Sequence, residues 1–253
     1  MTNDGASHKT SPAPGLNNED DHSRQLLWER LRNIIDNLGP KDVYRSIYDH
    51  RGNLLVAGYH PARDELVQDF SKVDFRDKSV VDFGCNFGYF SFLAEKLGAR
   101  KVLGVDNHPD IIEGCRILAA LYESHATEFM VDNIENLQQV ADTFDIVMLI
   151  DYLGRFSIRK GKIPLILGVL ESLARTELLF IVRPVYHIRN ELRSEPAELA
   201  KLYPPRYIQD EYIEVLSFIE DFLAPRWSVR RISAMPKYYQ REKKVVHFTR
   251  KSI

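Results

Sequence analysis

The sequence has few cysteines, no long apolar run and no excess of one charge. Its two cysteines, Cys85 and Cys115, cannot by themselves form a disulfide framework or a four-ligand zinc site. The longest uncharged apolar run, residues 163–170, is far shorter than the roughly 20 residues that a transmembrane helix requires. The 34 basic and 36 acidic residues give a formal net charge of −2, which argues against a polycation built for nucleic acid.

The first 22 residues contain almost no large apolar side chains. They contain four acidic residues and no apolar stretch, so we expect no secretory signal peptide. A segment of this composition buries too little apolar surface to offset its ordering entropy, and we predict a disordered tail over residues 1–22. Together with the low cysteine content, this composition predicts a cytoplasmic protein.

Residues 23–78 contain apolar side chains at helical spacing but no alternation of strand and helix. Ser23 is a candidate N-cap for a helix whose leucines and isoleucines recur every three or four residues, and Gly39-Pro40 ends it. A second, charged helix is predicted over residues 62–70. We therefore expect an N-terminal helical cap on the domain that follows.

From Ser79 onward, short β-branched or aromatic runs alternate with longer amphipathic stretches, the pattern of a parallel α/β sheet. The predicted strands are residues 80–83, 102–105, 128–131, 146–150, 178–182, 229–235 and 245–249. The predicted helices are residues 89–97, 109–123, 134–141, 163–175 and 217–223. The last two strands are close enough to pair antiparallel. Residues 79–253 are thus expected to form one Rossmann-like, doubly wound domain of about seven strands, mostly parallel, with an antiparallel final pair.

A strand over residues 80–83 leads directly into a turn that contains Gly84 and Gly88, and then into a helix. Glycines allow a ligand to approach the backbone, and the amides at a helix start favour an anionic group. Asp82 is unusual in an apolar strand unless it has a partner. It could cap the amides of the turn, face a ligand, or do both.

Acidic residues also end the next strands. Asp106 is placed to accept hydrogen bonds from two ribose hydroxyls, or else to cap the helix that begins at residue 109. Asp132 or Asn133 could receive the amino group of an adenine, or else cap the helix predicted over 134–141. Asp151 follows the fourth strand, whose end should lie beside the same ligand.

These residues resemble the class I S-adenosylmethionine-dependent methyltransferases. The family's first motif is apolar-apolar-acid-apolar-Gly-x-Gly-x-Gly, and residues 80–88 match it except at Asn86, where glycine is usual. The resemblance covers about residues 78–253 and implies S-adenosylmethionine as cofactor. It places the methionine moiety and ribose at the turn, the ribose hydroxyls at Asp106, and the methyl-donor cleft at Asp151. The implied cofactor-binding residues are Asp82, Phe83, Gly84, Cys85, Asn86, Gly88, Asp106, Asn107, Asp132, Asn133 and Asp151.

Two other functions compete with methyl transfer: a nicotinamide-nucleotide-dependent oxidoreductase, and a non-catalytic scaffold that only binds S-adenosylmethionine. Asn86 in the glycine turn, the third acidic strand end and the antiparallel finish disfavour the oxidoreductase. The retained Asp82, Gly84 and Asp106 disfavour the scaffold.

The acceptor leaves a weaker trace in the sequence, because the sulfonium methyl is already electrophilic and needs mainly alignment. Arginines near the strand ends could hold a carboxylate or phosphate, or form surface ion pairs with Glu191 or Glu195. Histidines there are more often structural than basic catalysts, and their spacing predicts no metal site. The substrate-side candidates are Tyr59, His60, Tyr152, Arg155, Arg183 and His187.

Basic residues concentrate at the C-terminal end. Residues 226–253 carry nine Lys or Arg and one acid, with Trp227, Tyr238 and Tyr239 interleaved. Such a stretch can contact RNA, or it can be the solvated face of the final strand pair. The Asn-Pro-Pro-Tyr and Pro-Cys motifs of two nucleic-acid methylation chemistries are absent. We expect a small-molecule acceptor slightly more than RNA, and no membrane or disulfide partner.

Overall fold

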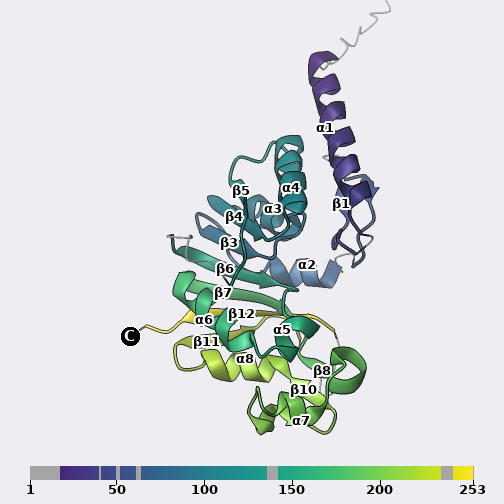
Figure 1. The fold of residues 1–253 in the computed structure, drawn as a ribbon. Coiled ribbons are helices and arrows are strands. Elements are labelled where there is room, and N and C mark those ends of the chain that lie inside the picture. The colour runs from purple at the N-terminus through teal and green to yellow at the C-terminus, as the bar shows by residue number, and fades with distance from the viewer. Residues whose placement is uncertain are drawn as a thin grey trace, which may run out of the picture.

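The computed structural model describes residues 18–39, 41–49, 52–60, 64–135, 142–234 and 242–252. A seven-stranded sheet crosses the middle of the molecule, and helices cover both of its faces (Figure 1). Its strands, from one edge to the other, are β11 (Trp227–Arg231), β12 (Lys244–Arg250), β7 (Ala174–Val182), β6 (Phe144–Ile150), β3 (Ser79–Phe83), β4 (Lys101–Asp106) and β5 (Thr127–Val131).

Strands β3 to β7 pair in parallel, whereas β12 is antiparallel to both of its neighbours, β7 and β11. The predicted Rossmann-like sheet with a closing antiparallel pair is therefore confirmed. β11 ends at Arg231, earlier than predicted, because the amides of Ile232 and Ser233 both bond to the carbonyl of Val245 and break the regular ladder. Position 235, the predicted strand end, lies outside the described residues.

One face of the sheet carries α2 (Asp64–Phe70), α3 (Tyr89–Lys96) and α4 (Pro109–Leu121). The other carries α6 (Ile163–Leu173) and α8 (Val215–Leu223). α6 is two residues shorter than predicted because β7 begins at Ala174, and α8 begins two residues earlier. Most of the helix predicted over 134–141 lies outside the described residues. This two-sided burial explains why the central strands are almost continuously apolar.

The N-terminal helix α1 (Asn18–Asn37) packs along α4, with Leu31 buried against it (Figure 1). It begins five residues before Ser23, so residues 18–22 of the predicted disordered tail belong to this helix. Residues 1–17 lie outside the described residues. A short hairpin of β1 (Ile47–Tyr48) and β2 (Leu54–Val56) follows, as part of the predicted cap.

A small second sheet between β7 and α8 has no counterpart in the sequence prediction. It is built from β8 (Val185–His187), β9 (Ile208–Gln209) and β10 (Tyr212–Glu214). Strands of two or three residues are too short to show an alternating pattern. The same connection holds short helical turns, and one more follows β6. These are α5 (Arg155–Arg159), η1 (Ile188–Leu192), α7 (Pro196–Leu199) and η2 (Pro205–Tyr207).

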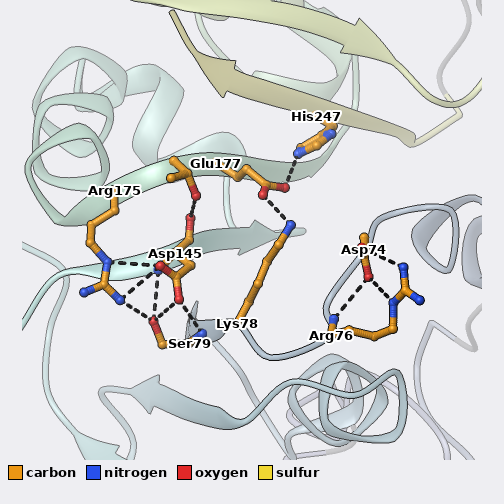
Figure 2. A network of polar contacts seen from close by, with 9 residues as sticks. Asp74, Arg76, Lys78, Ser79, Asp145, Arg175, Glu177 and His247 are labelled. Carbon is orange, nitrogen blue, oxygen red and sulfur yellow. Dashed lines mark hydrogen bonds and ion pairs between the residues drawn. The ribbon is translucent and has the colours of Figure 1, made fainter. Parts of the chain in front are cut away.

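Polar side chains join the strands where the parallel strands begin (Figure 2). Asp145 accepts hydrogen bonds from the amide and hydroxyl of Ser79, both at 2.8 Å, and pairs with Arg175. Glu177 lies between Lys78 and His247, whose imidazole Nε2 is 2.7 Å from the carboxylate. This network links β3, β6, β7 and β12 at the end of the sheet where the parallel strands begin, opposite their carboxyl ends.

Candidate active site

In the turn after β3, every second residue departs from ordinary backbone geometry. Gly84, Asn86 and Gly88 all have positive φ, at 70°, 49° and 73°. A Cβ at Gly84 would lie 2.5 Å from the Tyr152 ring, and one at Gly88 would lie 2.8 Å from the Phe129 ring. Both glycines are therefore required by backbone conformation and by close packing.

Asp106 ends β4 beside this turn. One carboxylate oxygen accepts the Asn86 amide at 3.0 Å, and the other accepts the His108 amide at 3.1 Å. His108, not Asp106, is the N-cap residue of α4, and its side chain makes no capping hydrogen bond, so Asp106 bonds to the N-cap amide without filling the capping role considered from the sequence. Two fixed amides hold the carboxylate toward a hollow at the strand ends, where lone pairs remain for a ligand.

This hollow, of about 30 Å³, lies on one side of the turn. Its lining comprises Phe83, Gly84, Val105, Asp106, Asn107, Asp132, Asn133, Ile134 and Tyr152. Asn107, Asn133 and Tyr152 also line a neighbouring hollow of about 340 Å³, which reaches Phe156 and Lys162. Asn133 accepts the Glu135 amide at 3.1 Å, so it caps the next turn as well.

Another hollow of about 30 Å³ lies on the other side of Gly84. Its lining comprises Tyr44, Arg45, Asp82, Gly84, Cys85, Asn86, Phe87, Tyr89, Phe90, Ile150 and Asp151. The family resemblance places the methionine part of the cofactor there. Asp82 is buried and accepts the Ser91 hydroxyl at 2.7 Å through one oxygen. It does not cap the amides of the turn. Its other oxygen has no hydrogen-bond partner among the described residues. Burial, reinforced by the charge of Asp106, raises the pKa of Asp82 to about 7.

Asp151 is the point at which distant parts of the chain converge. It follows β6 with φ of 57°, a conformation that is costly for a residue with a side chain, and its amide donates to Ile181 at 2.9 Å. Its buried carboxylate pairs with Arg45 and with Lys243, whose ammonium lies 2.9 Å away. Residues near both ends of the described chain thus meet at the end of β6.

Asn86 occupies the position where the family motif usually has glycine. Its side-chain oxygen accepts the Tyr44 amide at 3.0 Å, and its side-chain nitrogen donates to the Asp42 carbonyl at 2.6 Å. The residue that departs from the motif is therefore the one that fastens the N-terminal segment over the turn.

A fourth and larger cavity, of about 760 Å³, opens between α2 and the ends of β11 and β12. Its described lining comprises Arg45, His60, Glu65, Leu66, Gln68, Asp69, Lys72, Arg231, Ile232, Ser233, Ala234, Glu242, Lys243 and Lys244. Arg45 lines both this cavity and the hollow that contains Asp82. The two spaces therefore adjoin at the Asp151 ion pairs.

The six substrate-side candidates do not form one cluster in the structure. Three lie near the hollows and the cavity, and three lie around Glu191. His60 lines the cavity of about 760 Å³, and its ring packs edge-on against Tyr44. Partial burial and the nearby charges of Lys243 and Arg45 lower the pKa of His60. Tyr152 lines the hollows beside Asp106, whereas Tyr59 is half-exposed and packs on His60.

The other three candidates gather around Glu191. Arg183 forms an ion pair with its carboxylate, Arg155 donates to its carbonyl at 3.0 Å, and the His187 amide donates to its carboxylate at 2.8 Å. The ion-pair alternative for Arg183 is therefore the one that the structure contains. None of these three lines the hollows or the cavity described above.

Sequence reasoning missed Tyr44, Arg45 and Lys243. Arg45 and Tyr44 lie in a segment without helical or strand periodicity, and Lys243 lies within a run of basic residues. Their common feature is contact with Asp151 or with one another, with Lys243 donating to the Tyr44 hydroxyl at 3.0 Å. Such contacts between distant segments leave no local pattern in a single sequence.

Among the described residues, the structure holds no disulfide, no cluster of metal ligands and no helix suited to cross a membrane. Both cysteines are buried and free, and the Cys115 thiol lies 2.9 Å from the Asn86 carbonyl. No cluster of three or more potential metal ligands is found among the described residues. Within the same ranges, no helix has the length and apolar character needed to cross a membrane.

Comparison with known proteins now identifies the class. The chain is similar in fold to the magnesium protoporphyrin IX methyltransferase of Synechocystis PCC 6803, solved with bound S-adenosylhomocysteine, at a TM-score of 0.52, 16% identity and coverage of 91% of this chain and 97% of that one. It is also similar to the bifunctional kinase-methyltransferase WbdD, at a TM-score of 0.54, 18% identity and coverage of 87% and 46%. These likenesses show the methyltransferase fold.

A family model described as a methyltransferase domain matches residues 74–218, more than half of the chain. The chain belongs to this family and is a class I S-adenosylmethionine-dependent methyltransferase, as the sequence motif predicted. The oxidoreductase and scaffold alternatives are set aside. Ribosomal protein L11 methyltransferase of Escherichia coli O8 (strain IAI1) is 41% identical over 59 residues, or 23% of this chain and 20% of that protein. The chain thus aligns with about a fifth of that relative's length.

Proposed function

We propose that the protein transfers the methyl group of S-adenosylmethionine to a small molecule that enters the large cavity between α2 and the ends of β11 and β12, which we name the acceptor cavity. The observation that carries this proposal is the junction at Arg45, which places a cavity of about 760 Å³ directly beside the donor turn. A volume of this size is within the range of small-molecule sites, on the order of 300–1,000 Å³. The cavity also lies at the carboxyl edge of the sheet, where ligands of α/β folds bind.

The residues around the turn fit the donor. Asp106 is proposed to hold the ribose hydroxyls, because its carboxylate is already oriented by two amides. The adenine is proposed to lie along the hollows lined by Asn133 and Tyr152. The methionine part would then lie across Gly84, where the unpartnered oxygen of Asp82 is available to its ammonium group.

When bound, S-adenosylmethionine supplies a sulfonium methyl group that is already strongly electrophilic. The protein therefore has to align the acceptor's nucleophile with that methyl and exclude water. Arg45, Asp151 and Lys243 lie where the donor and acceptor spaces adjoin, and the ion pairs to Asp151 fix the geometry of that junction. His60 has a lowered pKa and lines the cavity, so at neutral pH it is available to take a proton from a protonated nucleophile.

The RNA alternative depends on the basic C-terminal stretch, and much of that charge is used within the chain. Arg226 pairs with Glu171, and Arg231 pairs with Glu220 through two nitrogens. Arg250 donates to the carbonyls of Glu171 and Ala174. Side chains held in this way have fewer donors left for phosphates, which supports the small-molecule acceptor.

The test is a transfer assay with isotopically labelled S-adenosylmethionine, run on a small-molecule extract and on an RNA pool in parallel. We expect label in the small-molecule extract and none in RNA. An Arg45→Met variant should lose most of this transfer, whereas an Arg32→Met variant on the exposed face of α1 should retain it. Label in RNA alone would overturn the proposal.

A further inference from the structure

Among the described residues, the lining of the acceptor cavity holds more basic than acidic side chains, and one of the basic groups differs from the others. The five basic residues are Arg45, Lys72, Arg231, Lys243 and Lys244, and the three acids are Glu65, Asp69 and Glu242. Four of the five have a carboxylate in direct contact. Lys72 contacts Asp69, Arg231 contacts Glu220, and both Arg45 and Lys243 contact Asp151.

Lys244 is paired more loosely than these four. Its side chain is only 10% exposed, and its ion pair with the exposed Glu242 carboxylate spans 3.8 Å. Among the described residues its ammonium makes no hydrogen bond, and the neighbouring Asp69 carboxylate is already bonded by Lys72 and Ser233. An ammonium on a side chain that is mostly buried, with only this long ion pair, would gain from a closer anion, and an anionic ligand in the cavity could supply one.

The position of Lys244 also suits a substrate contact. It is the first residue of β12 and pairs with Val182, the last residue of β7, so it lies at the carboxyl edge of the sheet. The preceding residue, Lys243, reaches Asp151 at the donor turn. A group held by Lys244 would therefore lie in the same cavity as the reacting centre, one residue along the chain from it.

Resting on the proposed function, we infer that the acceptor is an anionic small molecule whose carboxylate or phosphate pairs with Lys244 in the acceptor cavity. The anionic group fixes the substrate at the edge of β12, and its nucleophile extends toward Arg45 and Asp151. Carboxylate and phosphate share the chemistry that an ammonium recognises, and the experiment distinguishes them.

The first experiment uses two probes, inorganic phosphate and benzoate, titrated into the protein saturated with S-adenosylhomocysteine at constant ionic strength. Binding is followed by the backbone amide resonances of Ser233 and Lys244. We expect saturable shifts with at least one probe, and a Kd raised about tenfold or more in Lys244→Met. Lys201→Met, an exposed position outside the cavity, should bind as the wild type does. No saturable shift with either probe, or an unchanged Kd in Lys244→Met, would overturn the inference.

The second experiment separates a small-molecule extract into anionic, neutral and cationic fractions before the labelled transfer assay. Label in the anionic fraction supports the inference, and its loss after phosphatase treatment identifies phosphate over carboxylate. Label confined to the neutral or cationic fraction overturns the inference but leaves the proposed function standing. Label in no fraction overturns both. Unchanged affinity of Lys244→Met and Lys244→Gln for S-adenosylhomocysteine shows that both variants are folded.

Discussion

Asp82 illustrates how a single buried side chain can report on ligand binding. It lies within an apolar strand, its environment favours the protonated form, and one of its oxygens has no described partner. An acidic residue in this state destabilises the fold when it ionises, unless a cation approaches it. The sequence marked Asp82 as unusual, and the structure supplies the physical reason.

The pH dependence of stability should reveal this group. The pKa of Asp82 is about 7 in the folded protein, against about 3.8 when exposed, so the folded state holds a proton that the unfolded state has released. Stability should therefore fall as pH rises from about 4 through 7, by up to about 4 kcal/mol from this group. We expect Asp82→Asn to be more stable than the wild type at pH 8 and similar to it at pH 4. Chemical denaturation without donor checks this, and equal stabilities at pH 8 would contradict it.

Asp106 allows a direct test of the donor assignment. We expect Asp106→Ala to bind S-adenosylhomocysteine roughly 10- to 150-fold more weakly, since charge-assisted hydrogen bonds contribute about 1.5–3 kcal/mol. The variant also loses an acceptor for the Asn86 and His108 amides, so circular dichroism must show that it is folded. Asp110→Ala, exposed in the first turn of α4, is the matched control. Unchanged affinity in a folded Asp106→Ala would refute the ribose assignment.

The segment before the β1–β2 hairpin owes its place to a few hydrogen bonds. The Asn86 side chain bonds to the backbone of Asp42 and Tyr44, which positions Arg45 against Asp151. Replacing Asn86 by the usual glycine of the motif removes both bonds but suits the positive φ. The expected result is a conformationally intact turn that no longer holds this segment.

Hydrogen exchange can measure that tether. We expect the Tyr44 amide to exchange at least tenfold faster in Asn86→Gly, because its acceptor is gone, while the amides of β3 remain protected. Turnover should fall along with this protection. Equal protection of the Tyr44 amide in both proteins would show that the segment is held by other contacts.

Helices and strands with a long apolar pattern could be predicted from the sequence. Very short strands, and contacts between residues far apart in the chain, could not. The central strands and α3, α4 and α6 were placed within a few residues because each presents several apolar positions at one period. β8, β9 and β10 were missed because two or three residues show no period. The turn residues were found through local motif spacing, whereas Arg45 and Lys243 meet Asp151 only through folding.

Glu177 tests whether the network at the starting edge of the parallel strands is structural (Figure 2). Although burial opposes it, hydrogen bonds from His247 and Lys78 lower the pKa of Glu177. Its contribution to stability should therefore be present above about pH 4.5 and be lost as pH falls below that value. We expect Glu177→Gln to lose about 3 kcal/mol at pH 7, without a change in donor affinity. A variant that lost donor affinity but kept its stability would contradict this division.

Across the whole molecule, the two edges of the sheet carry different kinds of polar residue. At the starting end of the parallel strands in Figure 2, Lys78 pairs with Glu177 and Arg175 pairs with Asp145, which ties strands together, whereas Asp74 and Arg76 pair within the loop before β3. At the carboxyl ends of the parallel strands, one oxygen of Asp82 has no described hydrogen-bond partner, and Lys244 has only its 3.8 Å ion pair with Glu242. Such incompletely paired groups are where we expect a ligand to bind. Whether the basic residues near the C-terminus can bind RNA therefore depends on which of them are already paired within the chain, and not on their net charge.

That distinction determines how RNA binding must be tested. Arg231, Lys243 and Lys244 line the acceptor cavity, so their replacement would impair a small-molecule acceptor and an RNA acceptor alike. Arg226, Arg230 and Lys251 lie outside the cavity lining, and replacing these three by Gln isolates the surface charge. RNA held by this surface would bind more weakly as salt rises, with a slope that decreases by about one for each phosphate contact removed. Because Arg226 and Lys251 already bond within the chain, we expect no steep salt dependence in the wild type and no change in the triple variant. A wild-type slope of several units that falls in the triple variant would instead make RNA the acceptor to pursue.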